Sequence, residues 1–376
     1  MTDRRQFIQQ AGILASAAAI GGLTPSIARA QTAKLRVGMM LPYTGTYAAL
    51  GTAITQGFNL AVEESGGMVG GRAIEYFTVD DESEPSKATD NANKLVQRDK
   101  VDVLIGTVHS GVVMAMVKVA RDNGTLLIIP NAGANAATGG QCAPNIFRTS
   151  FSNWQPAHPM GKVMYDKGHR KVVTLTWKYG AGEESIESFK EAFTKAGGAI
   201  VKEMYLPFPN VEFQPFITEI ASLKPDAVFV FFAGGGAVKF TKDYAAAGLK
   251  EKIPLYGSGF LTDGTLEAQG ASAQGLLTTL HYGDGIENPK NKNSATTTAR
   301  STASRPTSMP CRVTTPHCCS TAGSTQSRAA SATGRRCTAH WKRSRSTARE
   351  GPGRCRRRTI RSRISTCAAS RAMRTR

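Results

Sequence analysis

One pair of residues in this sequence has the types that hydrolytic chemistry would use. His109 directly precedes Ser110, and a histidine beside a serine could act as a general base for a nucleophile. Neighbours in a chain seldom share the hydrogen-bonded geometry of such a pair, and the sequence has no G-x-S-x-G elbow. His109 is therefore interpreted as a loop residue. A hydrolase acting on amides or esters stays the alternative from the enzyme class.

Two other patterns could indicate cofactors. Gly234-Gly235-Gly236 follows a predicted strand, as a dinucleotide-binding loop would, but the spaced glycines of that fingerprint are missing. A tight turn from strand to helix is predicted there instead. His158, His169 and His281 stand isolated, without the spacing of metal ligands. No cofactor and no metal are predicted.

The loops that follow the predicted strands combine small residues with aromatic ones. They run over residues 42–47, 106–111, 130–135, 177–180, 233–236 and 257–260. Small residues with free backbone N–H groups at helix starts can bind anions. The aromatic side chains beside them, those of Tyr43, Tyr47, Tyr179 and Phe260, could either pack or contact a ligand. The pattern predicts a small ligand with a carboxylate and an apolar body.

These loops need a scaffold of alternating strands and helices. Apolar runs predict strands at Leu35–Leu41, Ile74–Val79, Val103–Ile105, Leu126–Ile129, Val172–Thr176, Ile200–Tyr205, Ala227–Phe232, Pro254–Tyr256 and Leu276–Leu280. Amphipathic helices are predicted between them, one opened by Ser83-Glu84-Pro85 and another closed by Gly197-Gly198. In the helix closed by Gly197-Gly198, the polar face that carries Glu183, Glu184 and Glu187 is interpreted as exposed to solvent.

Strands joined by helices and apolar on both faces indicate parallel sheets that are covered on each side. The predicted fold is α/β, with two doubly wound parallel-sheet lobes, a hinge and a cleft between the lobes. Residues 145–154 are predicted to cross between the lobes. Ligands bind beyond the carboxyl ends of such strands, where the loops described above lie.

Six motifs in order resemble those of the branched-chain amino-acid binding proteins of ABC importers, which have the type I periplasmic binding fold. They are residues 38–45 (GMMLPYTG), 106–110 (GTVHS), 131–135 (NAGAN), 145–148 (NIFR), 179–180 (YG) and 257–260 (GSGF). The resemblance covers about residues 34–292. It implies two lobes that close on a ligand and deliver it to permease and ATPase subunits. A monomer is predicted, and no nucleic-acid partner is predicted because the excess positive charge lies only at the ends of the chain. A ligand-sensing domain that presents its ligand to a receptor stays a further alternative.

The resemblance also implies which residues hold the ligand. Ser110 matches the serine that binds the α-carboxylate, and residues 132–134 match a loop whose backbone N–H groups assist it. The ligand-binding residues expected are Tyr47, Ser110, Ala132, Gly133, Ala134, Asn135, Tyr179, Gly235 and Phe260. Ala134 and Gly259 replace a threonine and an acidic residue that bind the ammonium in the family. An aromatic or aliphatic acid is therefore expected as readily as leucine.

The N-terminus has the features of an export signal. Arg4-Arg5 followed by Gln6-Phe7-Ile8 resembles the twin-arginine motif, and a small-residue site ends at Ala30. The apolar run over residues 11–23 is shorter than the about 20 residues that a membrane anchor needs. A buried helix or an anchor is the alternative reading. Cleavage after Ala30 and a periplasmic location are predicted.

The positive charge of the chain is confined to its ends. The formal net charge is +19, yet residues 31–293 carry 25 basic and 26 acidic residues. Residues 294–376 hold 19 basic residues, one acidic residue and six of the seven cysteines. Such composition is typical of disordered or nucleic-acid-binding tails.

A frameshift near Lys292 is the interpretation preferred for that tail. Residues 309–321 (MPCRVTTPHCCST) can be encoded so that the shifted frame reads AVQGYDTALLLD, and residues 358–368 so that it reads HNPIQDIYLR. Both strings suit the family. The predicted organisation is a signal peptide over 1–30, lobe 1 over 31–148, lobe 2 over 149–282, a return segment over 283–292, and a disordered out-of-frame tail over 293–376.

Overall fold

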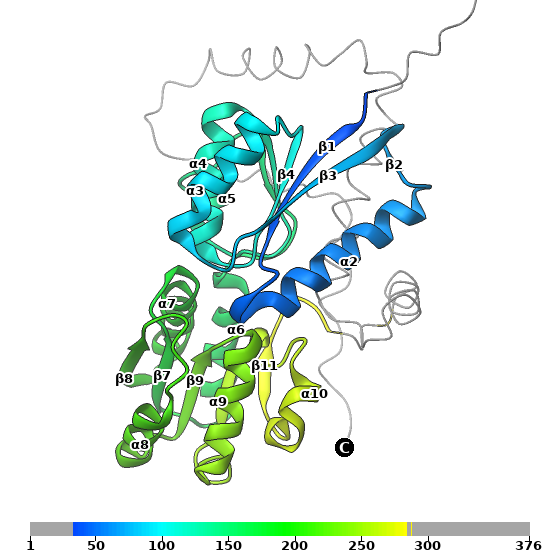
Figure 1. Cartoon of the computed structure of the whole chain (residues 1–376). Helices are drawn as coiled ribbons and strands as arrows, with labels where there is room; N and C mark the ends of the chain where they lie inside the picture. Colours follow the sequence, from blue (N-terminus) through cyan, green and yellow to red (C-terminus); the bar gives the residue numbers. More distant parts are fainter. Residues whose placement is uncertain (1–32, 284–286, 288–376) are drawn as a thin grey trace, which may run out of the picture. The chain divides into compact units, whose positions relative to one another are not determined.

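Two β-sheets organise the part of the chain that the computed structural model describes, residues 33–283 and residue 287 (Figure 1). The predicted signal peptide and basic tail lie outside the described residues. The strand order is β2-β3-β1-β4-β5-β6 in the first sheet and β11-β10-β9-β7-β8 in the second. Every pairing is parallel except the antiparallel pair β2 and β3. The predicted fold class is confirmed.

We call the first sheet with its helices lobe 1 and the second lobe 2. The strands of lobe 1 are β1 (Leu35–Leu41), β2 (Met68–Val69), β3 (Arg72–Asp80), β4 (Val103–Ile105), β5 (Leu126–Ile129) and β6 (Ile146–Arg148). Its helices are α2 (Ala48–Glu64), α3 (Pro85–Asn93), α4 (Ser110–Asn123) and α5 (Asn135–Thr138).

Lobe 2 has the same alternation. Its strands are β7 (Lys171–Trp177), β8 (Ala199–Leu206), β9 (Ala227–Phe231), β10 (Leu255–Ser258) and β11 (Leu277–Thr279). Its helices are α6 (Trp154–Asp166), α7 (Gly180–Lys195), α8 (Gln214–Leu223), α9 (Gly234–Ala246) and α10 (Leu266–Gln269).

All nine predicted strands are present within one or two residues of their predicted ends. Two short strands were not predicted. The two-residue strand β2 pairs with β3 across Gly70-Gly71, whose positive φ angles suit a tight hairpin turn. Strand β6 has three residues and lies in the segment predicted only as a crossing. Runs this short carry too little apolar periodicity to be recognised.

The predicted helix boundaries follow from local chemistry. Helix α3 begins at Pro85, and the side chain of Glu84 accepts a hydrogen bond from the Ser86 N–H. Helix α7 ends at Lys195, just before Gly197, whose φ of +106° stops the helical path.

Successive side chains along the strands of lobe 1 point to opposite faces of the sheet, and an apolar layer covers each face. Val37 and Met39 pack with Ile54 of α2, whereas Met40 packs on the other face with Met116 of α4. Figure 1 shows α2 on one side of the sheet and α3, α4 and α5 on the other. Lobe 2 is layered similarly, with α6 and α7 against one face of its sheet and α8 and α9 against the other.

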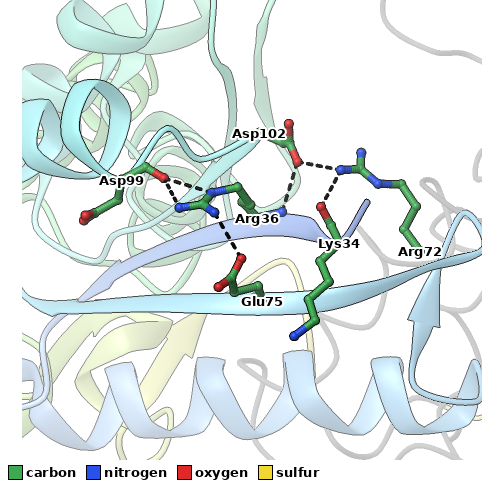
Figure 2. A network of polar contacts seen from close by, with 6 residues as sticks. All are labelled: Lys34, Arg36, Arg72, Glu75, Asp99 and Asp102. Carbon is green, nitrogen blue, oxygen red and sulfur yellow. Dashed lines mark hydrogen bonds and ion pairs between the residues drawn. The ribbon is translucent and has the colours of Figure 1, made fainter. Parts of the chain in front are cut away.

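A polar network joins the amino ends of the lobe 1 strands (Figure 2). The Arg36 guanidinium donates to Glu75 Oε2 at 3.2 Å and to the Asp99 carbonyl at 2.7 Å. Asp102 Oδ2 accepts from the Arg36 N–H and from Arg72. These side chains are about one-third exposed or more, so each ion pair adds little stability. The network lies at the strand ends opposite the loops that are predicted to bind a ligand.

Candidate ligand-binding site

A pocket forms where the loops that follow seven strands meet at the carboxyl ends of both sheets. Its space, including the open mouth, is about 320 Å³. The strand order reverses between β1 and β4 in lobe 1 and between β7 and β9 in lobe 2. Such switch points are where ligands bind in open α/β sheets. The lining consists of Tyr47, Leu50, Val108, Ser110, Asn131, Gly133, Phe151, Asn153, Tyr179, Ala181, Phe231, Ala233 and Phe260.

Three helices begin at this pocket, one from lobe 1 and two from lobe 2. Ser110 is the first residue of α4, and Tyr179 and Ala233 are the N-caps of α7 and α9. The side chains of Tyr179 and Ala233 make no capping hydrogen bond to the first N–H groups of α7 and α9. The partial positive charges of these helix N-termini give the pocket a positive potential, which favours binding of an anionic group.

Ser110 is buried at the start of α4 with its hydroxyl available to a ligand. Asn153 Nδ2 donates to Ser110 Oγ at 3.2 Å, so the serine oxygen acts as an acceptor. No hydrogen bond among the described residues uses the Ser110 hydroxyl as a donor. A Cβ atom added to Gly180 would lie 3.7 Å from Ser110 Cβ, so the starts of α4 and α7 approach each other closely.

Glu184 of α7 lies behind the pocket wall and contacts lobe 1. Its two oxygens accept from the Asn135 N–H at 3.1 and 3.0 Å, and Oε2 accepts from Asn153 Nδ2 at 2.7 Å. The interpretation of Glu184 as a solvated residue is therefore wrong. Burial raises the pKa of its carboxyl group, and the hydrogen bonds from Asn135 and Asn153 oppose that shift.

Arg148, at the end of β6, supports the same region. Its guanidinium donates to the carbonyl of Ala134 at 2.6 Å and to Thr138 Oγ1 at 2.6 Å. Burial lowers the pKa of Arg148 to about 10, and the nearby charge of Glu184 opposes this shift. The loop after β5 is thus held by hydrogen bonds with both Arg148 and Glu184.

His109 serves as a cap and an aromatic contact. Its Nδ1 accepts from the Gly111 N–H at 3.0 Å, which caps α4. The ring stacks on Tyr179 of lobe 2, with centroids 4.6 Å apart, and packs against Phe208. Burial lowers the pKa of His109 to about 4, so the ring is neutral at pH 7.

Aromatic side chains form the apolar walls of the pocket. The Phe151 and Phe260 rings lie 4.6 Å apart, and Phe231 packs edge-on to Phe260. On another wall the hydroxyl groups of Tyr47 and Tyr179 lie within hydrogen-bond distance of each other. These surfaces suit a flat apolar ligand body.

The structure brings five of the nine predicted ligand-binding residues to the pocket: Tyr47, Ser110, Gly133, Tyr179 and Phe260. The other four lie off its wall. The Ala132 N–H donates to the Thr107 carbonyl, Ala134 packs in the core beneath α4, and the Asn135 N–H is bonded to Glu184. Gly235 is exposed in the first turn of α9. Ligand contact by any of the nine stays a prediction.

Several lining residues were not among the predicted ligand-binding residues. Phe151 and Asn153 follow β6, the strand that was not predicted, so no loop was assigned there. Asn131 and Ala233 belong to the predicted loops 130–135 and 233–236, but they were not singled out within them. Had β6 been recognised, the rule that loops after strands form the site would also have pointed to Phe151 and Asn153.

Gly259 is the position at which the family resemblance would place an acidic side chain. A Cβ atom added there would lie 2.4 Å from Leu280 Cβ, so a larger residue requires movement of its neighbours. Among the described residues that line the pocket, none is acidic. The pocket therefore offers an ammonium group no direct carboxylate partner.

Within residues 33–283 and at residue 287, no group of three or more histidine, cysteine, aspartate or glutamate side chains is arranged to hold a metal ion. In the same part of the chain, no helix is long and apolar enough to cross a membrane.

Comparison with known families and structures gives matches along most of the chain. The family model described as periplasmic binding protein matches residues 34–311. The Leu/Ile/Val-binding protein homolog 6 of Brucella melitensis is 31% identical over 284 residues, which cover 74% of this chain and 72% of the relative.

Two solved structures are also similar. A solute-binding protein of an ABC transporter from R. palustris, in complex with benzoate, is 51% identical with a TM-score of 0.74, covering 76% of this chain and 78% of that one. A solute-binding protein from Rhodopseudomonas palustris BisB5, in complex with 3,4-dihydroxybenzoic acid, is 32% identical with a TM-score of 0.71, covering 75% and 77%.

Proposed function

Since the chain belongs to the periplasmic binding protein family and is the solute-binding protein of an ABC transporter, we propose that its ligand is a benzoate-type aromatic carboxylate. The observation that carries this proposal is the pocket lining, in which the described residues include five aromatic side chains and no charged one. Delivery of the ligand to a permease follows from the family.

The carboxylate is proposed to bind at the start of α4. The Ser110 hydroxyl has its hydrogen free, and the uncapped starts of α7 and α9 face the same pocket. Hydrogen bonds to an anion are stronger than those between neutral groups. The aromatic ring would lie against Phe151 and Phe260.

An amino acid fits these surroundings less well. Its ammonium would be desolvated beside helix N-termini, whose partial charge is positive. None of the described lining side chains carries a negative charge that could neutralise it. The similarity to a protein crystallised with benzoate, at 51% identity, supports the aromatic acid over the amino acid.

We infer binding rather than catalysis at this pocket. A hydrolase would need a base that can accept the Ser110 proton, but His109 Nδ1 already accepts from Gly111, and the His109 ring stacks on Tyr179. A receptor-sensing role would use the same pocket and differ only in the partner. Genes for permease and ATPase subunits beside this gene would favour import.

Titration calorimetry with benzoate, cyclohexanecarboxylate and leucine tests the ligand class. We expect benzoate to bind at least about a hundredfold more tightly than leucine, because the buried ammonium lacks a partner. Cyclohexanecarboxylate has the same charge without the flat ring and reports the contribution of the aromatic walls. Tighter binding of leucine than of benzoate would contradict the proposal.

A further inference from the structure

Glu184 does not line the pocket, yet it is joined to Ser110 through a single side chain. The Asn153 amide donates to Glu184 Oε2 at 2.7 Å and to Ser110 Oγ at 3.2 Å. Asn153 and Ser110 are each about 2% exposed, so water does not compete for these bonds. A chain of hydrogen bonds thus runs from α7 of lobe 2 to the ligand space.

The orientation of the Asn153 amide decides what Ser110 can offer. With the NH₂ group toward Ser110, the serine oxygen accepts and its hydrogen is free to point into the pocket. With the amide turned over, Oδ1 would take the serine hydrogen, and Ser110 would present lone pairs instead. A ligand carboxylate would then meet an acceptor.

Glu184 selects the first orientation. An ionised carboxylate only accepts hydrogen bonds, so it holds the NH₂ group of Asn153 on its side. The Asn135 backbone N–H donates to both Glu184 oxygens and keeps the carboxylate in place. The other polar atom of the Asn153 amide, Oδ1, lies against Gly133. A Cβ atom added to Gly133 would be 2.1 Å from Oδ1, so only glycine leaves room for this oxygen.

We propose that Glu184 is a positioning residue that sets the hydrogen-bond polarity of the pocket through Asn153, making Ser110 a donor and the site selective for ligands whose polar end accepts. The inference rests on the proposed function, because it places the ligand carboxylate at Ser110. It predicts that the pocket binds a carboxylate more tightly than a primary amide of the same shape. Both oxygens of a carboxylate accept hydrogen bonds, whereas the NH₂ group of an amide donates.

The expected sign separates this role from simple electrostatics. Removal of the Glu184 charge should strengthen anion binding if only charge repulsion matters. If Glu184 instead fixes the orientation of the Asn153 amide, its removal should weaken anion binding, because Ser110 would no longer always donate its hydrogen to the ligand. Glu184→Gln removes the charge but keeps an acceptor for Asn153, whereas Glu184→Ala removes both.

The test measures the dissociation constants of benzoate and benzamide for the full chain and three variants. In Glu184→Ala we expect benzoate to bind about tenfold more weakly and benzamide to change by less than about threefold. Glu184→Gln should keep the preference for benzoate. Glu187→Ala removes a carboxylate from an exposed position of the same helix and should leave both ligands unaffected. Unchanged or tighter benzoate binding in Glu184→Ala, or equal losses for both ligands, would overturn the proposal.

Hydrogen exchange of the Asn153 side-chain amide, followed by NMR without ligand, tests the same chain independently. Slow exchange of both amide hydrogens is expected in the unmodified protein, with Glu184→Ala exposing one of them. Fast exchange in the unmodified protein, or no change in Glu184→Ala, overturns the role of Glu184. If neither aromatic ligand binds the unmodified protein, the proposed function fails, and the exchange result still decides the role of Glu184.

Discussion

The hydroxyl oxygens of Tyr47 and Tyr179 lie 2.7 Å apart, and this hydrogen bond joins lobe 1 to lobe 2 beside the ligand space. Tyr47 ends the loop after β1, and Tyr179 precedes α7. Burial raises the pKa of both hydroxyl groups, so both are protonated at neutral pH and one donates to the other. The pair holds the two lobes together at the pocket.

Tyr179→Phe should therefore weaken ligand binding through easier opening of the lobes. A neutral hydrogen bond contributes about 1 kcal/mol, which corresponds to roughly a fivefold weaker affinity. Stopped-flow measurement should assign most of this change to faster dissociation. Tyr205→Phe is the matched control, because its hydroxyl bonds Glu203 within lobe 2. An equal effect of both variants would argue against the bridge.

Ser110→Ala tests the placement of the carboxylate. A charge-assisted hydrogen bond contributes about 1.5 to 3 kcal/mol, so benzoate binding should weaken by roughly ten- to a hundredfold. Ser222→Ala, at an exposed position of α8, controls for loss of a serine hydroxyl. Calorimetry measures both variants. Unaltered affinity in Ser110→Ala would mean that the carboxylate binds elsewhere.

His109 should make the folded state less stable in acid. Burial lowers its pKa from 6.5 to about 4, so between these values the unfolded chain binds more protons than the folded one. The stabilisation is complete above pH 6.5 and is lost as the pH falls through about 4, by up to about 1.4 kcal/mol per pH unit.

The matched variant for this prediction is His109→Asn, which can cap α4 without titrating. Urea denaturation at several pH values should show a shallower loss of stability for the variant below pH 6.5. Asp81, whose pKa burial raises to about 6, acts in the opposite direction, and the comparison cancels its contribution. Parallel pH profiles for the two proteins would refute the assignment to His109.

Export should depend on the arginine pair near the N-terminus. We expect the first 30 residues to be removed and periplasmic accumulation to be lost when Arg4 and Arg5 are both replaced with lysine. Cell fractionation and N-terminal sequencing of the secreted protein measure this. Undiminished accumulation of the variant would exclude the twin-arginine route.

The origin of the basic tail is open to a direct test. A frame change after the codon for about residue 292 should open a continuous reading frame that contains both AVQGYDTALLLD and HNPIQDIYLR. The nucleotide sequence of the gene checks this. The frame-restored chain should aggregate less and resist proteolysis better, because its recovered apolar segments could pack on lobe 1. Stop codons throughout the shifted frame would favour a genuine basic tail.

Local patterns sufficed for the scaffold. Buried parallel strands such as β7 and β9 are continuous apolar runs bounded by glycine or small polar residues, and their positions follow from the sequence. Because ligand-binding loops follow the carboxyl ends of such strands, the loops that contain Tyr47, Ser110 and Tyr179 could be predicted to meet without coordinates. The choice of Ser110 within its loop came from the family resemblance.

Only the tertiary structure decided how these loops act together. Asn153 is 43 residues from Ser110 and 31 from Glu184, and no periodicity links the three. The helical pattern places Glu184 on a polar face, which suggests exposure to solvent. The pattern does not show that residues of the other lobe contact this face. Hydrogen-bond direction depends on which donors and acceptors meet when both lobes are assembled, and that is a property of the fold as a whole.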